Sequence, residues 1–216
     1  MSYSSYHDEI VVLYKSYNEV IKPLIAEIEA RRESFPQAIY NEIRAFNDHI
    51  ARCYYNEFAD REFVKQELFK AKGHINRIIL DCYKFLNVFL YENVVKKFDK
   101  DTKVIDLSQV GDGHFYIEYK SGRQFIIEKL KEAKLMETKD KEKSLELYQL
   151  VHNKYSDLEN LITRNDTNII RARSRYYSTK TFGWLKWIIG VVIGAALSMF
   201  LSCDFVKNLC MEFVGH

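Results

Sequence analysis

Residues 187–203 read WIIGVVIGAALSMFLSC, a run of seventeen positions without a charged side chain. This length is at the lower limit for a helix that crosses the hydrocarbon core of a bilayer. Trp184 and Lys186 extend the run on one side with an aromatic ring and a long amine, which suit the membrane interface. The alternative is a buried core helix, but this run is apolar on every face. We therefore predict a transmembrane helix over residues 184–203 and a short tail over residues 204–216.

The charges on the two sides of this run are distributed unevenly. A single acid, Asp166, stands among the basic residues that precede the run, whereas the tail contains two acids, Asp204 and Glu212, and one lysine. By the positive-inside rule, the basic flank stays in the cytoplasm. We therefore expect residues 1–180 to form a cytoplasmic domain and the chain to span the membrane once. The basic residues are Arg164, Arg171, Arg173, Arg175, Lys180 and Lys186.

The rest of the chain has the composition of a helical protein. Its 216 residues include only two prolines and eight glycines, fewer than an ordinary domain contains. This scarcity excludes collagen-like and linker-rich chains and disfavours a small β-sandwich, while 15 tyrosines and 14 phenylalanines supply apolar area that disordered chains lack. A net charge of +2 does not indicate bulk electrostatic attraction to RNA or DNA, although it leaves a local basic patch open. We predict an all-α fold.

Helical periodicity divides the amino-terminal part into three predicted helices. The first covers residues 3–33, and we expect Pro23 to kink or split it, because proline disturbs a helix interior. The second covers residues 34–58 and the third covers residues 61–98. Together they indicate a helical bundle.

The helical pattern is interrupted once. Residues 99–122 contain the turn signals GDG and SG, and we expect a loop there. From about Arg123 the pattern resumes and continues through the charged stretch ETKDKEKS towards the membrane. We therefore predict a long stalk helix over about residues 123–180 that leads into the transmembrane helix.

The predicted stalk contains an apolar series with alternating spacings of three and four residues. Such spacing is typical of a coiled-coil seam, in which a single polar Asn can set the register. In one interpretation the seam joins copies of the chain, and in the other it is the inner face of the helical bundle. The series consists of Tyr148, Val151, Tyr155, Leu158, Ile162, Asn165 and Ile169, and it continues to Ala172 and Tyr176.

The predicted transmembrane helix has small residues at intervals of four. Gly190, Gly194 and Ser198 share one helix face, which allows helix backbones to approach closely in lipid. Together with the seam, this face predicts a homo-oligomer in the membrane. One span cannot enclose a water-filled path, so a transport role would require several copies in a ring.

Cysteines and histidines do not indicate a metal site. No CxxC pair and no Cys/His cluster with zinc spacing occurs, and the sequence lacks a P-loop, a dinucleotide fingerprint, a nucleophile elbow and HExxH. We therefore expect no metal and no cofactor. The cysteines are Cys53, Cys82, Cys203 and Cys210. The histidines that we interpret as isolated, and as structural or solvent-exposed, are His7, His74, His114, His152 and His216.

One pair of residues in the second predicted helix is of a type that catalyses RNA cleavage in other proteins. EIRAFNDHIARC, residues 42–53, contains Arg44 and His49 with four residues between them. A histidine can exchange a proton with a ribose 2′-hydroxyl, and an arginine can stabilise a charged phosphate. One ideal helix separates the two side chains by about 140°, so a working site would need two such helices facing each other. In the alternative, structural interpretation, Arg44 pairs with Asp48 and His49 lies beside the packed face.

The Arg-x4-His spacing and the helical-bundle pattern resemble the HEPN superfamily, whose ribonucleases use an Arg-x4-6-His motif in paired domains. Active members usually have Asn, Asp or His directly after the arginine, whereas this chain has Ala45. The resemblance implies a divergent HEPN-like bundle. It leaves open whether Arg44 and His49 are catalytic or only structural.

The combination of a divergent HEPN-like motif with one membrane span resembles the small membrane accessory proteins encoded beside type VI-B CRISPR RNA-targeting effectors. This resemblance implies a homo-oligomeric pore in the bacterial inner membrane that strengthens antiviral defence and is functionally linked to an RNA-guided CRISPR nuclease. The competing hypothesis is a membrane-tethered HEPN ribonuclease that acts as a toxin or defence effector. A third hypothesis is a structural anchor that recruits a cytoplasmic partner.

Overall fold

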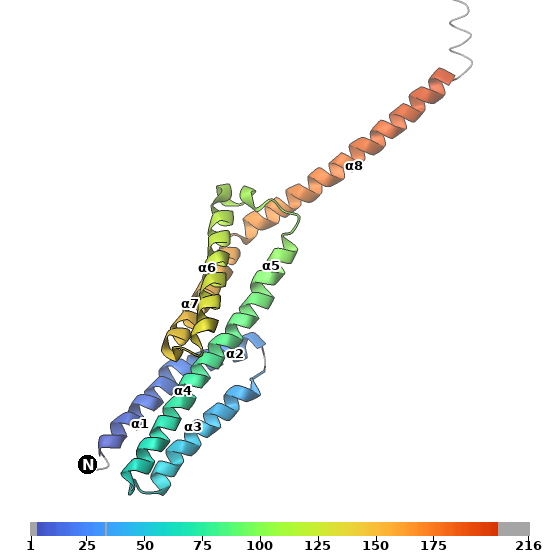
Figure 1. Cartoon of the computed structure of the whole chain (residues 1–216). Helices are drawn as coiled ribbons and strands as arrows, with labels where there is room; N and C mark the ends of the chain where they lie inside the picture. Colours follow the sequence, from blue (N-terminus) through green and yellow to red (C-terminus); the bar gives the residue numbers. More distant parts are fainter. Residues whose placement is uncertain (1–3, 33, 203–216) are drawn as a thin grey trace, which may run out of the picture. The chain divides into compact units, whose positions relative to one another are not determined.

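The chain is all-helical in the part that its computed structural model describes, residues 4–32 and 34–202 (Figure 1). No strand occurs in those residues, which confirms the all-α part of the prediction. The physical reason is the scarcity of proline and glycine, which leaves long stretches where each backbone N–H can bond within its own helix.

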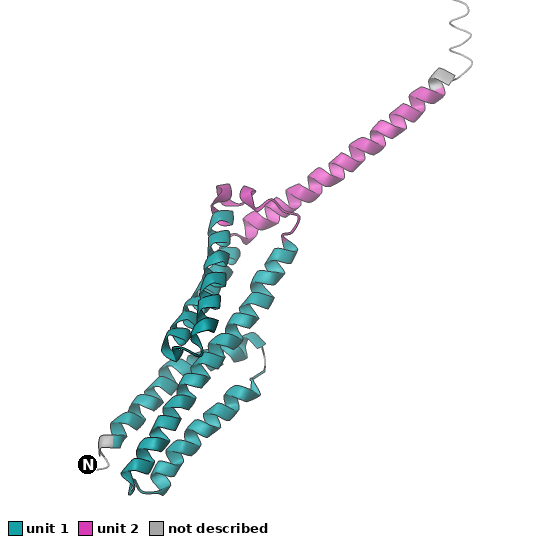
Figure 2. Cartoon of the chain, in the orientation of Figure 1, with its two compact units in different colours: residues 1–101, 116–164 teal, residues 102–115, 165–216 magenta. Residues whose placement is uncertain are grey.

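The chain divides into two compact units (Figure 2). The first unit contains residues 1–101 and 116–164, and the second contains residues 102–115 and 165–216. The division therefore falls within the region that we expected to be a single domain, residues 1–180.

The first helical run is not split at Pro23, because it stays helical from Ser4 to Arg32 with a π-helical turn before the proline. It comprises α1 (Ser4–Ser16), the π-helical turn η1 (Tyr17–Ile21) and α2 (Lys22–Arg32). Pro23 has no N–H to donate to the preceding turn, and the π-helical turn lies directly before it. Within this turn the Lys22 N–H donates to the carbonyl of Tyr17. Ile21 and Ile28 are fully buried, so the run keeps an apolar face on the core.

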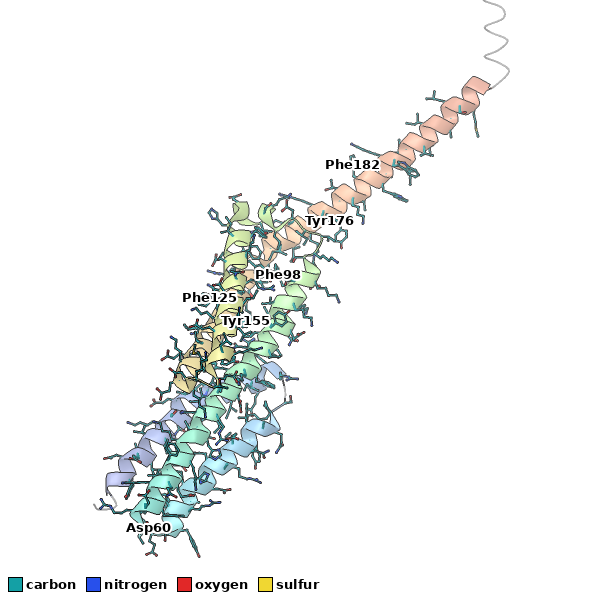
Figure 3. All side chains as sticks on the ribbon, viewed as in Figure 1. Asp60, Phe98, Phe125, Tyr155, Tyr176 and Phe182 are labelled. Atoms are coloured by element: carbon teal, nitrogen blue, oxygen red, sulfur yellow. The ribbon has the colours of Figure 1, made fainter. Side chains whose placement is uncertain are left out.

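Helices α3 (Gln37–Tyr55) and α4 (Arg61–Leu90) form an antiparallel hairpin and confirm the second and third predicted helices. The turn between them has Glu57 and Phe58 at positive φ. Asp60 follows the turn (labelled in Figure 3), and its carboxylate accepts hydrogen bonds from two backbone N–H groups in the first turn of α4. This N-cap explains where α4 begins.

Helix α4 is the centre of the first unit. It continues through the π-helical turn η2 (Tyr91–Val95) into α5 (Lys96–Asp101). One side of α4 contacts α1, α2, α3 and α7. Buried apolar side chains at helical spacing form this side: Val64, Leu68, Ile75, Ile78, Cys82, Leu86 and Leu90.

The predicted stalk helix over residues 123–180 is interrupted, so that prediction was wrong. Helix α6 (His114–Met136) ends at a turn over residues 137–140, and α7 (Lys141–Arg164) follows. Asp140 caps α7, because its carboxylate accepts a hydrogen bond from a backbone N–H of the first turn. The charged stretch ETKDKEKS thus contains a helix boundary, and the apolar side of α7 can pack on α4 in the same unit.

Helices α6 and α7 approach closely at a glycine. Gly122 is buried, and a Cβ added there would lie 2.7 Å from Cδ2 of Leu158 on α7. The SG dipeptide that we interpreted as a turn signal therefore lies inside α6, where the missing side chain allows the two helices to pack.

The segment over residues 102–113 belongs to the second unit. It contains two short 3₁₀ turns, η3 (Leu107–Gln109) and η4 (Gly111–Gly113). All three residues of η4 have positive φ, which two glycines adopt without steric cost. The predicted loop over residues 99–122 is therefore shorter than we expected, because α5 and α6 occupy its two ends.

Helix α8 (Asp166–Ser202) is the long element of the second unit. It begins after Asn165, whose carbonyl accepts hydrogen bonds from the N–H groups of Asn168 and Ile169. Ile169 and Ala172 are buried in the first turns. From there the helix runs without interruption into the apolar stretch, so the last part of the predicted stalk is continuous with it.

Candidate functional site

Helix α8 contains the one stretch among the described residues that is long and apolar enough to cross a membrane. Its most apolar window has a mean hydropathy of 1.7, and none of this window is buried. Trp184 and Trp187 are 66% and 67% exposed, and Figure 3 shows Tyr176 and Phe182 on the same helix. A core helix would be covered by other parts of its chain. The exposure of this stretch is what a transmembrane helix requires.

The small-residue face of α8 is open. A Cβ added at Gly190 or Gly194 would meet nothing within 4 Å, and Ser198 is exposed. Nothing in the described chain therefore covers this face. The end of the predicted span at Cys203 and the tail with Cys210 lie outside the described residues.

The predicted oligomer seam lies on two different elements. Its first part is buried within the first unit, so those side chains belong to the inner face of the bundle, the second of our two interpretations. They are Tyr148, Val151, Tyr155 (labelled in Figure 3) and Leu158. Ile162 is half-buried near the end of α7, whereas Asn165 and Ile169 belong to the second unit.

The Arg44–His49 motif lies on α3, and its two residues have different surroundings. Arg44 is exposed, and within residues 4–32 and 34–202 it makes no ion pair with Asp48. His49 is largely buried, with 13% of its side chain exposed, and its Nδ1 lies 2.8 Å from Oε2 of Glu67. The structural interpretation was therefore wrong about the Arg44 pair, while His49 does lie beside the packed face.

His49 belongs to two crossed Glu–His contacts between α3 and α4. Glu67 of α4 contacts His49 of α3, and Glu42 of α3 has its Oε2 2.6 Å from Nδ1 of His74 on α4. The two imidazole rings stack, with centroids 5.1 Å apart and 25° between their planes. We name these four side chains the crossed Glu–His pairs.

The same residue pattern occurs on both helices. Residues 42–52 read EIRAFNDHIAR and residues 67–77 read ELFKAKGHINR. In each segment a glutamate is followed by a histidine seven positions later and by an arginine three positions after that. Because the helices are antiparallel, the glutamate of each meets the histidine of the other. The arginines contact the opposite helix in the same way. Arg52 of α3 lies 3.5 Å from the Glu67 carboxylate, and Arg77 of α4 lies 3.5 Å from the Glu42 carboxylate.

Our sequence reasoning missed this arrangement, because we interpreted His74 as an isolated histidine. A signal was available in the repeated pattern E-x6-H-x2-R. A spacing of seven residues places Glu and His on one side of a helix, two turns apart. The spacing alone does not show that the two segments face each other.

Glu67 is a buried carboxylate whose charge is compensated. Its side chain is 2% exposed, and Nζ of Lys70 lies 2.7 Å from Oε1. Burial raises the pKa of Glu67, but hydrogen bonds from His49 and Lys70 and their charges outweigh it and lower the pKa to about 2. Glu67 therefore stays ionised at neutral pH and holds His49 in place.

An open groove of about 840 Å³ lies beside the crossed Glu–His pairs. His49 and His74 line it, with further residues of α4 and the first two turns of α7. The volume is within the range of about 300–1,000 Å³ that is typical of small-molecule sites. The charged and aromatic residues in the rest of the lining are Phe69, Lys70, Lys72, Arg77, Lys141, Glu142 and Glu146. Arg44 is not part of this lining.

The crossed Glu–His pairs can hold and transfer protons. A carboxylate that accepts the Nδ1–H of an imidazole leaves Nε2 available as an acid or a base. In the described part of the chain, Nε2 of His49 and Nε2 of His74 form no hydrogen bond. The arrangement is therefore suited to binding an anion or to acid–base chemistry.

A second polar cluster has a structural role. Arg31 of α2 donates two hydrogen bonds to Glu159 of α7 and one to Glu27 of its own helix. His152 of α7, which is buried, lies 3.2 Å from Glu27. Burial lowers the pKa of His152, so its neutral form is favoured. These contacts join α2 to α7 and place His152 in the core.

The remaining candidate groups do not assemble into a site. Cys53 and Cys82 are buried and unbridged, and burial raises the pKa of the Cys82 thiol to about 12. Among the described residues, no group of three or more His, Cys, Asp or Glu side chains is placed to hold a metal ion. No protein-family model, no curated protein and no solved structure matches this chain. The resemblance to HEPN proteins and to CRISPR accessory proteins therefore rests on the sequence features given above.

Proposed function

We propose that the chain is a single-pass membrane protein that associates with copies of itself through α8 and permeabilises the membrane. One observation carries this proposal: the apolar stretch of α8 is exposed on all sides. In water such a helix would expose a large apolar area, whereas lipid and neighbouring copies would cover it. Several spans must surround the pore, because one helix encloses no path for water.

The open face of α8 supports close packing of copies. Gly190 and Gly194 have no neighbouring atom within reach of a Cβ, so the helix of another copy could approach them closely. The basic residues of the first half of α8 support a cytoplasmic location for the first unit. The bacterial inner membrane as the site of insertion follows only from the resemblance to CRISPR accessory proteins.

Leakage from dye-loaded liposomes tests the proposal directly. Purified full-length protein should release the dye, and Gly194→Leu should reduce the release by blocking close helix contact. Ala196→Leu is the matched control, because it adds the same bulk on the opposite side of the helix. Liposomes that stay tight at high protein density, also with an RNA-guided nuclease and its target RNA present, would overturn the proposal.

We extend the proposal to antiviral defence, and the resemblance to CRISPR accessory proteins is what supports this extension. We expect the protein to lower phage yield only in cells that also contain an active RNA-guided CRISPR nuclease. Phage plaque counts with and without that nuclease, and with Gly194→Leu as the impaired variant, measure this link. Equal protection without the nuclease would contradict the link while leaving the pore proposal intact.

The second candidate is a membrane-tethered HEPN ribonuclease, and the favouring observation is His49 in a groove with its Nδ1 on Glu67. Arg44 lies outside that groove, so a HEPN-type site would need the α3 helices of two copies to face each other. For such an enzyme, Arg44→Ala and His49→Ala should each abolish RNA cleavage in vitro and leave assembly unchanged. Absence of any cleavage by the wild-type protein excludes it.

A further inference from the structure

We propose that the groove beside the crossed Glu–His pairs binds the phosphate of a nucleotide unit, either a free nucleotide or one within single-stranded RNA. This site goes beyond the pore proposal and does not depend on it. It also differs from a HEPN-type site, because it lies within one copy of the chain and excludes Arg44.

The two imidazoles supply a pair of oriented donors. When both nitrogens of a ring carry protons, Nδ1 donates to its glutamate and Nε2 can donate to an anion. Glu67 and Glu42 hold the Nδ1 atoms of His49 and His74 at 2.8 and 2.6 Å. The two rings stack with their centroids 5.1 Å apart, and the proposed site holds one tetrahedral oxyanion within reach of both Nε2 groups, at charge-assisted distances of about 2.7–2.9 Å.

Lysines on two helices add positive charge to the groove. Lys72 of α4 and Lys141 of α7 line it, and neither forms an ion pair in the described part of the chain. Glu142 and Glu146 line the same groove and oppose an anion. The positive surplus is therefore small and local, in keeping with the net charge of the chain. Affinity should depend on these particular lysines rather than on bulk charge.

An exposed aromatic ring extends the groove beyond a simple anion site. Phe69 is 80% exposed and lines the groove three positions before Lys72 on α4. Residues three apart on a helix are neighbours on its surface, so one ligand can contact both. A nucleobase can stack on an exposed ring while its phosphate meets the lysine. This combination favours a nucleotide over inorganic phosphate.

Fluorescence anisotropy with full-length protein in detergent tests the site. The probe is a fluorescein-labelled single-stranded oligouridine RNA, with adenosine monophosphate and inorganic phosphate as competitors. Competition by low concentrations of adenosine monophosphate identifies a free nucleotide as the ligand, and weak competition identifies the strand. Failure of both RNA and nucleotide to bind overturns the proposal. Equal competition by nucleotide and inorganic phosphate overturns the assignment of a nucleotide.

Exposed groove residues provide variants that should not disturb the fold. Phe69→Ala should weaken binding about tenfold, the loss expected for one stacked base. Lys72→Gln should weaken binding and reduce its salt dependence, whereas Tyr55→Ala and Lys65→Gln, both exposed and outside the groove, should change neither. Groove variants that bind as tightly as these controls would overturn the proposal.

Two further variants separate ligand binding from structural support. Glu142→Gln removes an opposing charge and should tighten binding. His74→Gln should abolish binding, and circular dichroism with thermal unfolding shows whether the helices remain. Because these measurements use detergent micelles and no liposomes, failure of this site is distinguishable from failure of the pore.

Discussion

Helices α4 and α8 are both long, at 30 and 37 residues, but they differ in what covers their apolar side chains. Helix α4 buries most of them against other helices of its unit, with Phe69 and Val88 as exposed exceptions. Helix α8 has them on all sides over its apolar stretch, and nothing in the described chain covers them. An amphipathic helix can fold against its own chain, whereas an apolar one needs a partner outside it.

The comparison can be tested with the same substitution on each helix. Leu86 of α4 is fully buried, and Leu86→Ala should lower the free energy of unfolding by about 2–5 kcal/mol, because it removes buried methyl groups and leaves a cavity. Leu197 of α8 is 57% exposed, and Leu197→Ala should change it by less than about 0.5 kcal/mol. Chemical unfolding of the full chain in detergent measures both. Equal losses would contradict the comparison.

A charge placed on α8 tests whether lipid is its partner. Ile193→Arg should disfavour insertion by about 3–4 kcal/mol, because an arginine at the centre of a span is costly in hydrocarbon. Ile170→Arg is the matched control, since both isoleucines are 54% exposed on α8 but Ile170 precedes the apolar stretch. Alkaline extraction of membranes should release the first variant and retain the second. Retention of both would show that position 193 does not lie in the hydrocarbon core, and release of the unmodified chain would argue against insertion.

The buried carboxylate of α4 gives the bundle a pH dependence. The pKa of Glu67 is about 2 in the folded chain, below the ordinary value of 4.5, so its contribution is complete above that value and disappears as pH falls towards 2. The loss should be on the order of 3 kcal/mol in total. Glu67→Gln should remove this part of the pH dependence, and Glu29→Gln, at an exposed position, should retain it. Unfolding curves between pH 7 and about pH 2 provide the measurement; identical pH profiles for the two variants would refute this role.

The smallest expected effect concerns the start of α4. Asp60→Ala should lower the free energy of unfolding by about 1 kcal/mol, because two backbone N–H groups lose their acceptor. Asp60→Ser keeps an oxygen that can accept a hydrogen bond and should retain most of the stability. Thermal unfolding compares the two. If serine is as damaging as alanine, capping is not the cause.

Much of the architecture could be predicted because helix periodicity and apolar runs are local properties. The helices before residue 98 and the apolar stretch of α8 both follow from residues within one or two turns of each other. The stalk could not be predicted as parts of three helices. No proline or glycine marks the boundary at Asn165 between α7 and α8, and none marks the boundary in ETKDKEKS between α6 and α7. The turn exists there because the apolar side of α7 gains burial against α4.

The candidate site was only partly predictable for the same reason. His49 was selected from its spacing to Arg44, but the residues that surround it come from α4 and α7. Likewise, the three-and-four spacing from Tyr148 to Leu158 indicates an apolar helix side without indicating what covers it. Local sequence shows which side chains share one face of a helix, but it does not show which other helix packs against that face.

The sequence by itself determined that the chain is helical and that one helix is apolar on all sides, because both depend on composition and on spacing along the chain. Only the tertiary structure decided that the glutamate of each E-x6-H-x2-R segment meets the histidine of the other. That outcome depends on the antiparallel register of α3 and α4, which the turn before Asp60 and the buried contacts between the two helices set together.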